Sequence, residues 1–164
     1  MGFDYDDLTQ NFGRIWPIYT AQFCDLLVTL RQAFGGDLDG MLVMAVIGTR
    51  TLAWGHIQGL SYGEVMALAP SEAELAPINL QSIADYSGIP RETVRRKIQA
   101  LRRAGWVEKR DDGYLIATAK AATDLAPTTE ATLRYLLAIG DACTQASSAS
   151  RAPHTAPRST DLAR

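Results

Sequence analysis

Basic side chains are concentrated in residues 90–110 of this chain. This segment holds eight bases and two acids, a net charge of +6, whereas residues 1–89 hold three bases and ten acids, a net charge of −7. Guanidinium groups bind phosphate, and each can bond two acceptors of guanine at once. The segment is therefore suited to bind a polyanion, and the acidic remainder would repel that polyanion elsewhere and so orient its docking.

These bases lie on a predicted helix over residues 91–105, which has an apolar stripe of Val94, Ile98 and Leu101. If Val94 faces the core, the rotation of ~100° per residue along a helix identifies the residues on the outward side of this helix. That side carries Glu92, Arg96, Gln99 and Arg103, with Arg91 and Arg95 flanking it near the helix start. The start of a recognition helix reaches base edges, where arginine bonds guanine and glutamate accepts from cytosine. We expect Arg102 and Arg103 to meet phosphate or solvent.

A second helix, over residues 79–87, precedes the basic one across a tight turn. Ala84 is expected to face the basic helix, because a larger side chain would push the two helices apart. Gly88 supplies the positive φ of the turn, Val94 fills the gap between the helices, and Pro90 begins the second helix. Gln81, at the start of the first helix, and Thr93 are predicted to contact phosphate.

Residues 106–116 form two β-like runs joined by an Asp-Gly turn, which predicts a hairpin. A helix, a turn, a basic helix and a hairpin together make a winged helix-turn-helix, an organisation that mostly holds a helix in a DNA groove. Lys109 and Arg110, near the tip, suit a wing that touches the minor groove or the backbone. Asp111 and Asp112 beside them would face phosphate unfavourably, so the helix contact is the better supported of the two.

The run Ser-Ile-Ala-Asp-Tyr-Ser-Gly-Ile-Pro-Arg-Glu-Thr-Val-Arg-Arg at residues 82–96 resembles the helix-turn-helix of bacterial winged-helix transcriptional regulators. Its Arg-Glu-Thr-Val-x-Arg part is similar to the cyclic-AMP-receptor type, over roughly residues 78–118. The resemblance implies that Arg91, Glu92 and Arg96 read bases and that Thr93 lies near a phosphate. No stretch resembles a cyclic-nucleotide-binding β-roll. The layout, with helices before and after the winged helix, is similar to the multiple-antibiotic-resistance regulator family, although the Asp-x-Arg wing pattern of that family is missing.

The remaining chain predicts a mainly helical protein with five segments. They are an N-terminal helical dimerisation or core region (1–58), a linker (59–77), the winged helix-turn-helix (78–120), a C-terminal helix (121–146) and a disordered tail (147–164). In the first region, one amphipathic helix ends at Gly35-Gly36 and is either continuous or broken at Pro17. Asp37 or Asp39 caps a second, largely apolar helix that runs to about His56. Tyr62–Leu68 predicts a helical turn or two, and Thr128 or Thr129 is expected to cap the last helix.

The first and last helices carry more apolar surface than a small winged helix can cover, which predicts a homodimer reading an inverted-repeat operator in double-stranded DNA. The candidate interface residues are Phe12, Trp16, Phe23, Leu27, Leu133 and Leu137, for which core packing is the alternative. A small-molecule effector pocket walled by Trp16, Tyr19, Trp54 and Tyr62 is a weaker expectation, because aromatic residues at helical spacing more often belong to a core.

The sequence argues against several other classes of protein. Its two histidines, His56 and His154, and the lack of a metal-binding or P-loop motif predict neither an enzyme nor a cofactor. Its longest apolar run, Met41–Ile47, is too short to span a membrane, and no secretory signal is expected, so the location predicted is cytoplasmic. Cys24 and Cys143 are expected to be buried, reduced thiols, with a disulfide or redox switch as the alternative. The alternative function is a winged-helix adaptor that binds protein and not DNA.

Overall fold

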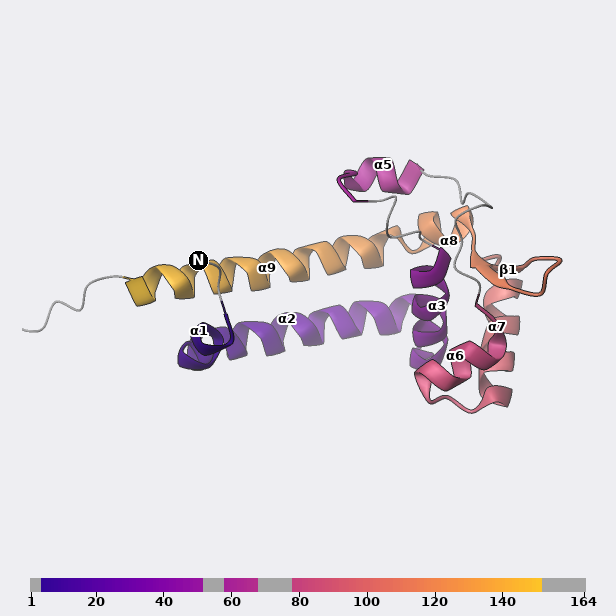
Figure 1. Cartoon of the computed structure of the whole chain (residues 1–164), viewed down its shortest axis with the longest axis horizontal. Coiled ribbons are helices and arrows are strands. Elements are labelled where there is room, and N and C mark those ends of the chain that lie inside the picture. The colour runs from indigo at the N-terminus through magenta and orange to yellow at the C-terminus, as the bar shows by residue number, and fades with distance from the viewer. Residues whose placement is uncertain (1–3, 52–57, 68–77, 152–164) are drawn as a thin grey trace, which may run out of the picture. The chain divides into compact units, whose positions relative to one another are not determined.

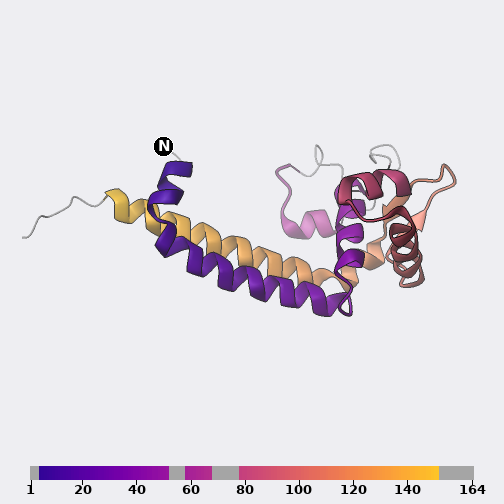
Figure 2. The ribbon, with the colours of Figure 1, turned by 90° about the horizontal axis from the view of Figure 1, so that it is seen from below.

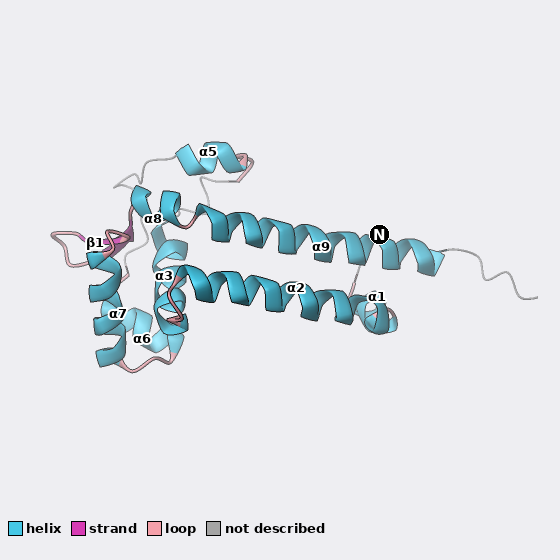
Figure 3. Ribbon diagram, turned by 180° about the vertical axis from the view of Figure 1, so that it is seen from behind, coloured by secondary structure: helices cyan, strands magenta, loops and turns pink. Residues whose placement is uncertain are grey.

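The computed structural model describes residues 4–51, 58–67 and 78–151. These residues are mainly helical with a single hairpin, as the sequence predicts for a winged helix-turn-helix flanked by helices (Figures 1 and 3). The elements in chain order are α1 (Tyr5–Gln10), α2 (Phe12–Ala33), α3 (Leu38–Thr51), α5 (Tyr62–Ala67), α6 (Leu80–Ser87), α7 (Arg91–Arg103), β1 (Val107–Lys109), β2 (Leu115–Ala117), α8 (Ala119–Asp124) and α9 (Ala126–Arg151).

The chain forms two compact units, and the boundaries between them fall inside α2 and α9. One unit combines residues 1–25 with residues 133–164, and the other comprises residues 26–132. We call the second the winged-helix unit, because it contains α3, α6, α7 and the hairpin. The sequence assigned α3 to the N-terminal region, but α3 packs against α6, α7 and β2. It is therefore the third helix of the winged helix-turn-helix.

The core of the winged-helix unit is built from one face of each of these helices and from the hairpin. On α6 and α7 the buried residues are those that the apolar pattern predicts, namely Ile83, Ala84, Val94, Ile98 and Leu101. The core is completed mainly by α3 and the hairpin, with Val43, Met44, Val46, Ile47, Val107 and Leu115. Burial of these side chains supplies the main force that holds the helix-turn-helix against α3.

Short polar contacts set where the helices of this unit begin and end. The Asp37 carboxylate caps α3 by accepting a bond of 2.8 Å from the Gly40 amide, which selects Asp37 over Asp39 as the cap. Asn79 caps α6 through a bond of 3.0 Å from the Ser82 amide. Gly88 ends α6 with a φ of 70°, the left-handed conformation expected of it. Pro90 is the residue before α7 and not its first residue, and α7 ends at Arg103, two residues earlier than predicted.

The hairpin is antiparallel, with Val107 opposite Ala117 and Lys109 opposite Leu115. Gly113, with a φ of 89°, supplies the tight turn that the Asp-Gly pair predicts. Two further bonds tie β2 to the body of the unit. The Leu115 amide donates to the Ile78 carbonyl at 3.0 Å, and the Ala117 amide donates to Thr51 Oγ1 at the end of α3 at 2.8 Å.

In the other unit, α2 continues through Pro17 without a break, and the chain is interrupted instead at Asn11, between α1 and α2. Aromatic rings stack in sequence along α2, with centroid distances of 4.9 Å from Phe12 to Trp16 and 5.1 Å from Trp16 to Tyr19. Tyr135 of α9 packs edge-on to Tyr19 at 6.5 Å. Trp16 and Tyr19 thus belong to this stack, whereas Tyr62 belongs to the winged-helix unit and Trp54 lies outside the described residues. The aromatic pocket that the sequence suggests therefore stays a prediction.

The C-terminal helices differ from the prediction in their bounds. The predicted single helix is two, because Thr118 caps the short α8 and α9 begins at Ala126. Thr128 is buried in the first turn of α9 and is not a cap. The helix also continues through Ser147 to Arg151, into the predicted tail. Cys24 is exposed and Cys143 half-buried, so the expectation that both are buried is wrong. Among the described helices, none has the length and apolarity needed to cross a membrane.

Candidate nucleic-acid interface

The polar face of α7 is exposed, and its apolar face is buried in the core. Arg91, Glu92, Arg95, Arg96 and Gln99 are all exposed, and Thr93 is half-buried. Val94 on the opposite side is fully buried. The helix can therefore present its charged face to a partner without disturbing its own packing, as recognition helices do.

The chain turns sharply from α7 into β1 at Gly105, which has a φ of 77°. The Trp106 amide donates to the Leu101 carbonyl at 2.9 Å, and the Gly105 amide donates to the Arg102 carbonyl at 3.0 Å. This pair of bonds is a Schellman motif, which ends a helix and redirects the chain. As a result, the first strand of the hairpin returns alongside the C-terminal half of α7; Figure 2 shows the hairpin projecting beyond α6 and α7.

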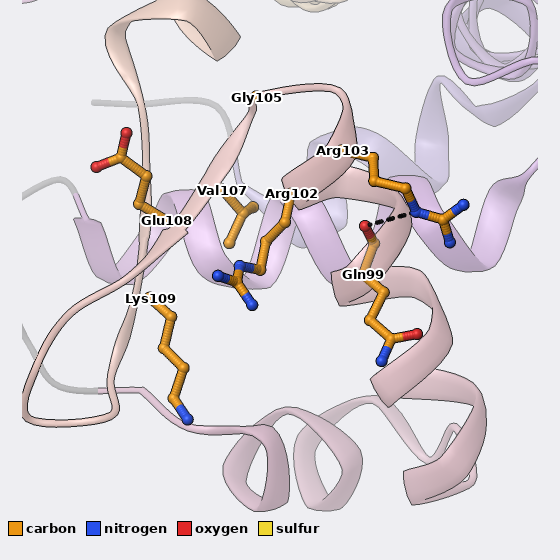
Figure 4. A pocket seen from close by; sticks show the side chains of 7 residues that line it. All are labelled: Gln99, Arg102, Arg103, Gly105, Val107, Glu108 and Lys109. Carbon is orange, nitrogen blue, oxygen red and sulfur yellow. Dashed lines mark hydrogen bonds between the residues drawn. The ribbon is translucent and has the colours of Figure 1, made fainter.

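A hollow of about 730 Å³ lies between the end of α7 and β1. In Figure 4 the side chains of Gln99, Arg102 and Lys109 point toward this open space; Glu108 also lines the hollow, with its carboxylate directed away from Lys109. We call this hollow the basic groove. Sequence reasoning predicted contacts for Gln99 and Lys109 separately, but it did not bring Arg102 together with them. The left-handed Gly105 turn was the signal that could have done so.

Glu92 and Arg95 are paired with each other across one turn of α7. The Arg95 guanidinium donates to both carboxylate oxygens of Glu92, with a shortest distance of 2.6 Å. The bond from Arg95 lowers the pKa of Glu92, and the same bond raises the pKa of Arg95. Both groups are exposed, so water screens the pair, and a base edge could compete for either partner.

Two other predicted contact residues also have partners within the protein. Arg96 donates to Thr93 Oγ1 at 3.3 Å, a bond between two residues that the sequence places at the DNA. Gln81 on α6 donates to the Asp85 carboxylate at 2.7 Å. This bond uses one of the two N–H donors of the Gln81 amide, so the second can still donate to a phosphate.

At the tip of the hairpin, the Arg110 guanidinium donates to the Asp112 carboxylate at 3.1 Å. The same Asp112 accepts from the Tyr114 amide at 3.1 Å and so shapes the turn. Of the two aspartates that the sequence places beside the wing bases, Asp112 is therefore the one that pairs with Arg110 and shapes the turn. Arg110 is half-buried and paired, which leaves Lys109, directed at the basic groove, as the better placed base of the wing.

Lys97 is the base of α7 that does not belong to the exposed face. Its ammonium group lies 2.6 Å from the Asp37 carboxylate, and both side chains are only partly exposed. Since Asp37 also caps α3, one carboxylate joins the recognition helix to the start of α3. A Cβ added to Gly40 would lie 2.6 Å from this carboxylate, so glycine at that position leaves room for the contact.

The contribution of this ion pair to stability should depend on pH. Burial alone would raise the pKa of Asp37, but bonds from Lys97 and the Gly40 amide lower it overall. A lowered carboxyl pKa stabilises the fold above the unfolded-state value, and that contribution is lost as the pH falls through the folded-state value. Lys97→Met should therefore cost up to about 1 kcal/mol at pH 7, and this cost should begin to shrink only as the pH falls below the ordinary carboxyl pKa of about 3.9. Denaturant unfolding at pH 7 and pH 3, with Lys109→Met as the control, measures this; an equal loss at both pH values would contradict it.

The fold and this surface define a winged helix-turn-helix with an exposed basic recognition helix. Comparison with known families agrees, because the family described as "Crp-like helix-turn-helix domain" matches residues 60–121. The match spans α5 through the hairpin and into α8, which is less than half of the chain. No curated protein and no solved structure matches the chain. Together the fold and the family match support a helix-turn-helix regulator that binds DNA.

Proposed function

We propose that this protein is a sequence-specific transcriptional regulator that places α7 in the major groove of its operator. The observation that carries the proposal is the exposed basic face of α7, held rigidly by the buried Val94 side and continued by the basic groove. Arg91, Glu92 and Arg96 read bases near the helix start. Thr93 and Gln81 contact phosphate, and Arg102 and Lys109 hold the backbone along the basic groove.

The ion pair between Glu92 and Arg95 affects how Glu92 can contact a base. With Arg95 bound to its carboxylate, Glu92 has less capacity to accept a bond from cytosine. Binding to DNA then exchanges the pair for contacts to a base edge and a phosphate. Because the pair is exposed, breaking it costs little, so both residues remain available to DNA.

We further propose that the regulator is a homodimer formed through α2 and α9. Both helices leave large apolar side chains in water, with Phe12 51%, Trp16 48% and Leu137 65% exposed. Phe23 and Leu133 add to this surface, while Leu27 is half-buried in the winged-helix unit. Apolar side chains that follow two long helices fit the same surface of a second copy, which is how two-fold dimers assemble. Such a dimer would read an inverted repeat with recognition helices ~34–36 Å apart.

A charge in this apolar surface should separate the two copies. Leu137→Glu buries an unpaired carboxylate if the dimer forms as proposed, and it is expected to give a monomer in sedimentation at micromolar concentration. Affinity for an inverted-repeat operator should fall about a hundredfold, because each copy then binds alone. Gln145→Glu, an exposed substitution on the same helix but rotated by about 80° from Leu137, is the matched control. A Leu137→Glu variant that sediments like the unmodified protein would contradict the interface.

The experiment that tests the function is selection of bound fragments from genomic DNA, followed by gel shifts at rising salt. Binding driven by phosphate contacts weakens linearly on a log–log plot of affinity against salt. Recovery of a shared inverted repeat with such a slope would support the regulator. Failure to enrich any DNA sequence at low salt would favour the alternative, a winged-helix adaptor that binds protein.

A further inference from the structure

A second hollow lies in the winged-helix unit, and it shares no lining residue with the basic groove. It has a volume of about 360 Å³ and is walled by α3, α5, the end of β2, α8 and the start of α9. Figure 2 shows α5 beside α3, and both helices contribute residues to the wall of the hollow. Much of the lining is alanine or glycine, side chains too small to fill the space between the helices. These small residues are Ala45, Gly48, Ala117, Ala119, Ala121 and Ala122.

The chemistry of this pocket selects against charge. None of the described residues that line it carries a charged side chain. Three of the four threonine hydroxyls in the lining already donate within the protein: Thr51 to the Ile47 carbonyl at 3.0 Å, Thr118 to the Gly105 carbonyl at 2.7 Å and Thr128 to the Leu125 carbonyl at 2.7 Å. A charged ligand would lose its hydration there without gaining an ion pair.

We propose that this pocket binds a small, uncharged, largely apolar organic molecule. Its volume is at the lower end of the range of ligand pockets, about 300–1,000 Å³. Apolar walls supply the affinity, because they exclude water from an apolar ligand. Tyr62 of α5 adds a ring and a phenol group to the lining, to which an aromatic ligand can stack.

The pocket is connected directly to the elements that present the basic groove. Ala117 is the residue of β2 that pairs with Val107 of β1, and its amide is held by Thr51 at 2.8 Å. Thr118 bonds the Gly105 carbonyl at the corner between α7 and β1. Gly105 and Val107 both line the basic groove. A ligand wedged against Ala117 and Thr118 therefore acts on the bonds that hold the hairpin beside α7.

This coupling, which rests on the proposed function, makes the pocket a regulatory site. A ligand that separates α3 from Ala117 favours a displaced hairpin and so weakens DNA binding. The expected decrease in DNA affinity is about fivefold or more, within the usual range of coupling between sites. The reciprocal effect follows: bound DNA should weaken ligand binding by the same factor.

Gly48 offers a substitution that fills the pocket without crowding the helix. A Cβ built at Gly48 meets no atom within 4 Å, and the residue lies inside α3. Gly48→Leu should therefore place a side chain in the empty space and also favour the helix. Gly13→Leu is the matched control, since Gly13 is a helical glycine in the other unit and is equally open.

The test uses 2-naphthol as an uncharged probe and 2-naphthoate as its charged counterpart, titrated into the full chain by calorimetry. We expect 2-naphthol to bind at least tenfold more tightly than 2-naphthoate, Gly48→Leu to weaken 2-naphthol at least tenfold, and Gly13→Leu to leave it unchanged. Absence of 2-naphthol binding, equal binding of both probes, or unchanged binding to Gly48→Leu would overturn the site.

The regulatory part is tested separately by gel shifts with and without saturating 2-naphthol. A ligand-dependent decrease in DNA affinity in the unmodified protein, absent in Gly48→Leu, would support it. If 2-naphthol binds and DNA affinity is unchanged, the regulatory coupling is overturned while the regulator itself stands. If no DNA is bound in any condition, the proposed function fails, and the calorimetric result still decides the ligand site.

Discussion

Arg96→Ala should lower affinity for a selected operator by about 1–3 kcal/mol for each half-site, and it should relax the base preference at one position of that half-site. Arg96 lies on the exposed face of α7, where it donates a long bond of 3.3 Å to Thr93 Oγ1 and its charge helps to lower the pKa of Glu92. Its guanidinium is thus free to take up two acceptors of a guanine. The measurement is gel-shift titration of operator variants that differ at single base pairs.

Arg102→Ala provides the contrast, because Arg102 lies near the end of α7 and points toward the basic groove, away from the helix start that we propose reads bases. It should weaken binding almost equally for all sequences and reduce the slope of log affinity against log salt by about 1. Arg14→Ala, at an exposed arginine of α2, removes the same charge outside the winged-helix unit and should change neither quantity.

If Arg96→Ala altered affinity but left every base preference intact, Arg96 would be a phosphate contact and not a reader of sequence.

Ile47→Ala should be among the most damaging single substitutions in the winged-helix unit, with a loss of about 2–4 kcal/mol of unfolding free energy. Ile47 is completely buried on α3, in the same core as Val94 of α7. Truncation leaves a cavity beneath the recognition helix, and the surrounding helices can relax only in part. Hydrogen exchange of the α7 amides should accelerate together with those of α3, because the two helices share one core.

The matched control is Leu42→Ala on the same helix. Leu42 is 36% exposed, so its truncation should cost less than about 1 kcal/mol and leave exchange in α7 nearly unchanged. If Ile47→Ala accelerated hydrogen exchange in α3 alone, α3 and α7 would open independently. In that case, α3 would not be part of the folding unit that holds the recognition helix.

The helix-turn-helix was predictable from the sequence because each of its constraints is local. Ala84, Gly88 and Val94 are separated by fixed intervals, and each residue type answers one steric need of a tight helical corner. The hairpin was predictable for the same reason, since Gly113 and the preceding aspartates specify the turn. The direction of the charged face then followed from the 100° rotation per residue about the buried Val94.

Errors in the prediction came from places where a local signal competes with its surroundings. Pro17 left open whether α2 is continuous or broken; the helix is continuous there, and the chain is interrupted instead at Asn11, which was not predicted. Thr128 is a residue type that often caps a helix, yet here its hydroxyl donates to the Leu125 carbonyl at 2.7 Å and its side chain is buried. A residue's preference does not reveal which of several nearby residues ends a helix.

The sequence by itself determined the winged helix-turn-helix, its apolar interior and the basic outer side of α7, because periodicity and turn chemistry act over a few residues. Only the tertiary structure decided which distant residues meet. It brought Lys97 to Asp37, sixty positions apart, and Ala117 to Thr51. It also placed α3 in the winged-helix unit, Arg102 beside the basic groove, and the small side chains of α3 and α8 around one pocket. Such contacts depend on how whole faces pack, and no spacing along the chain encodes them.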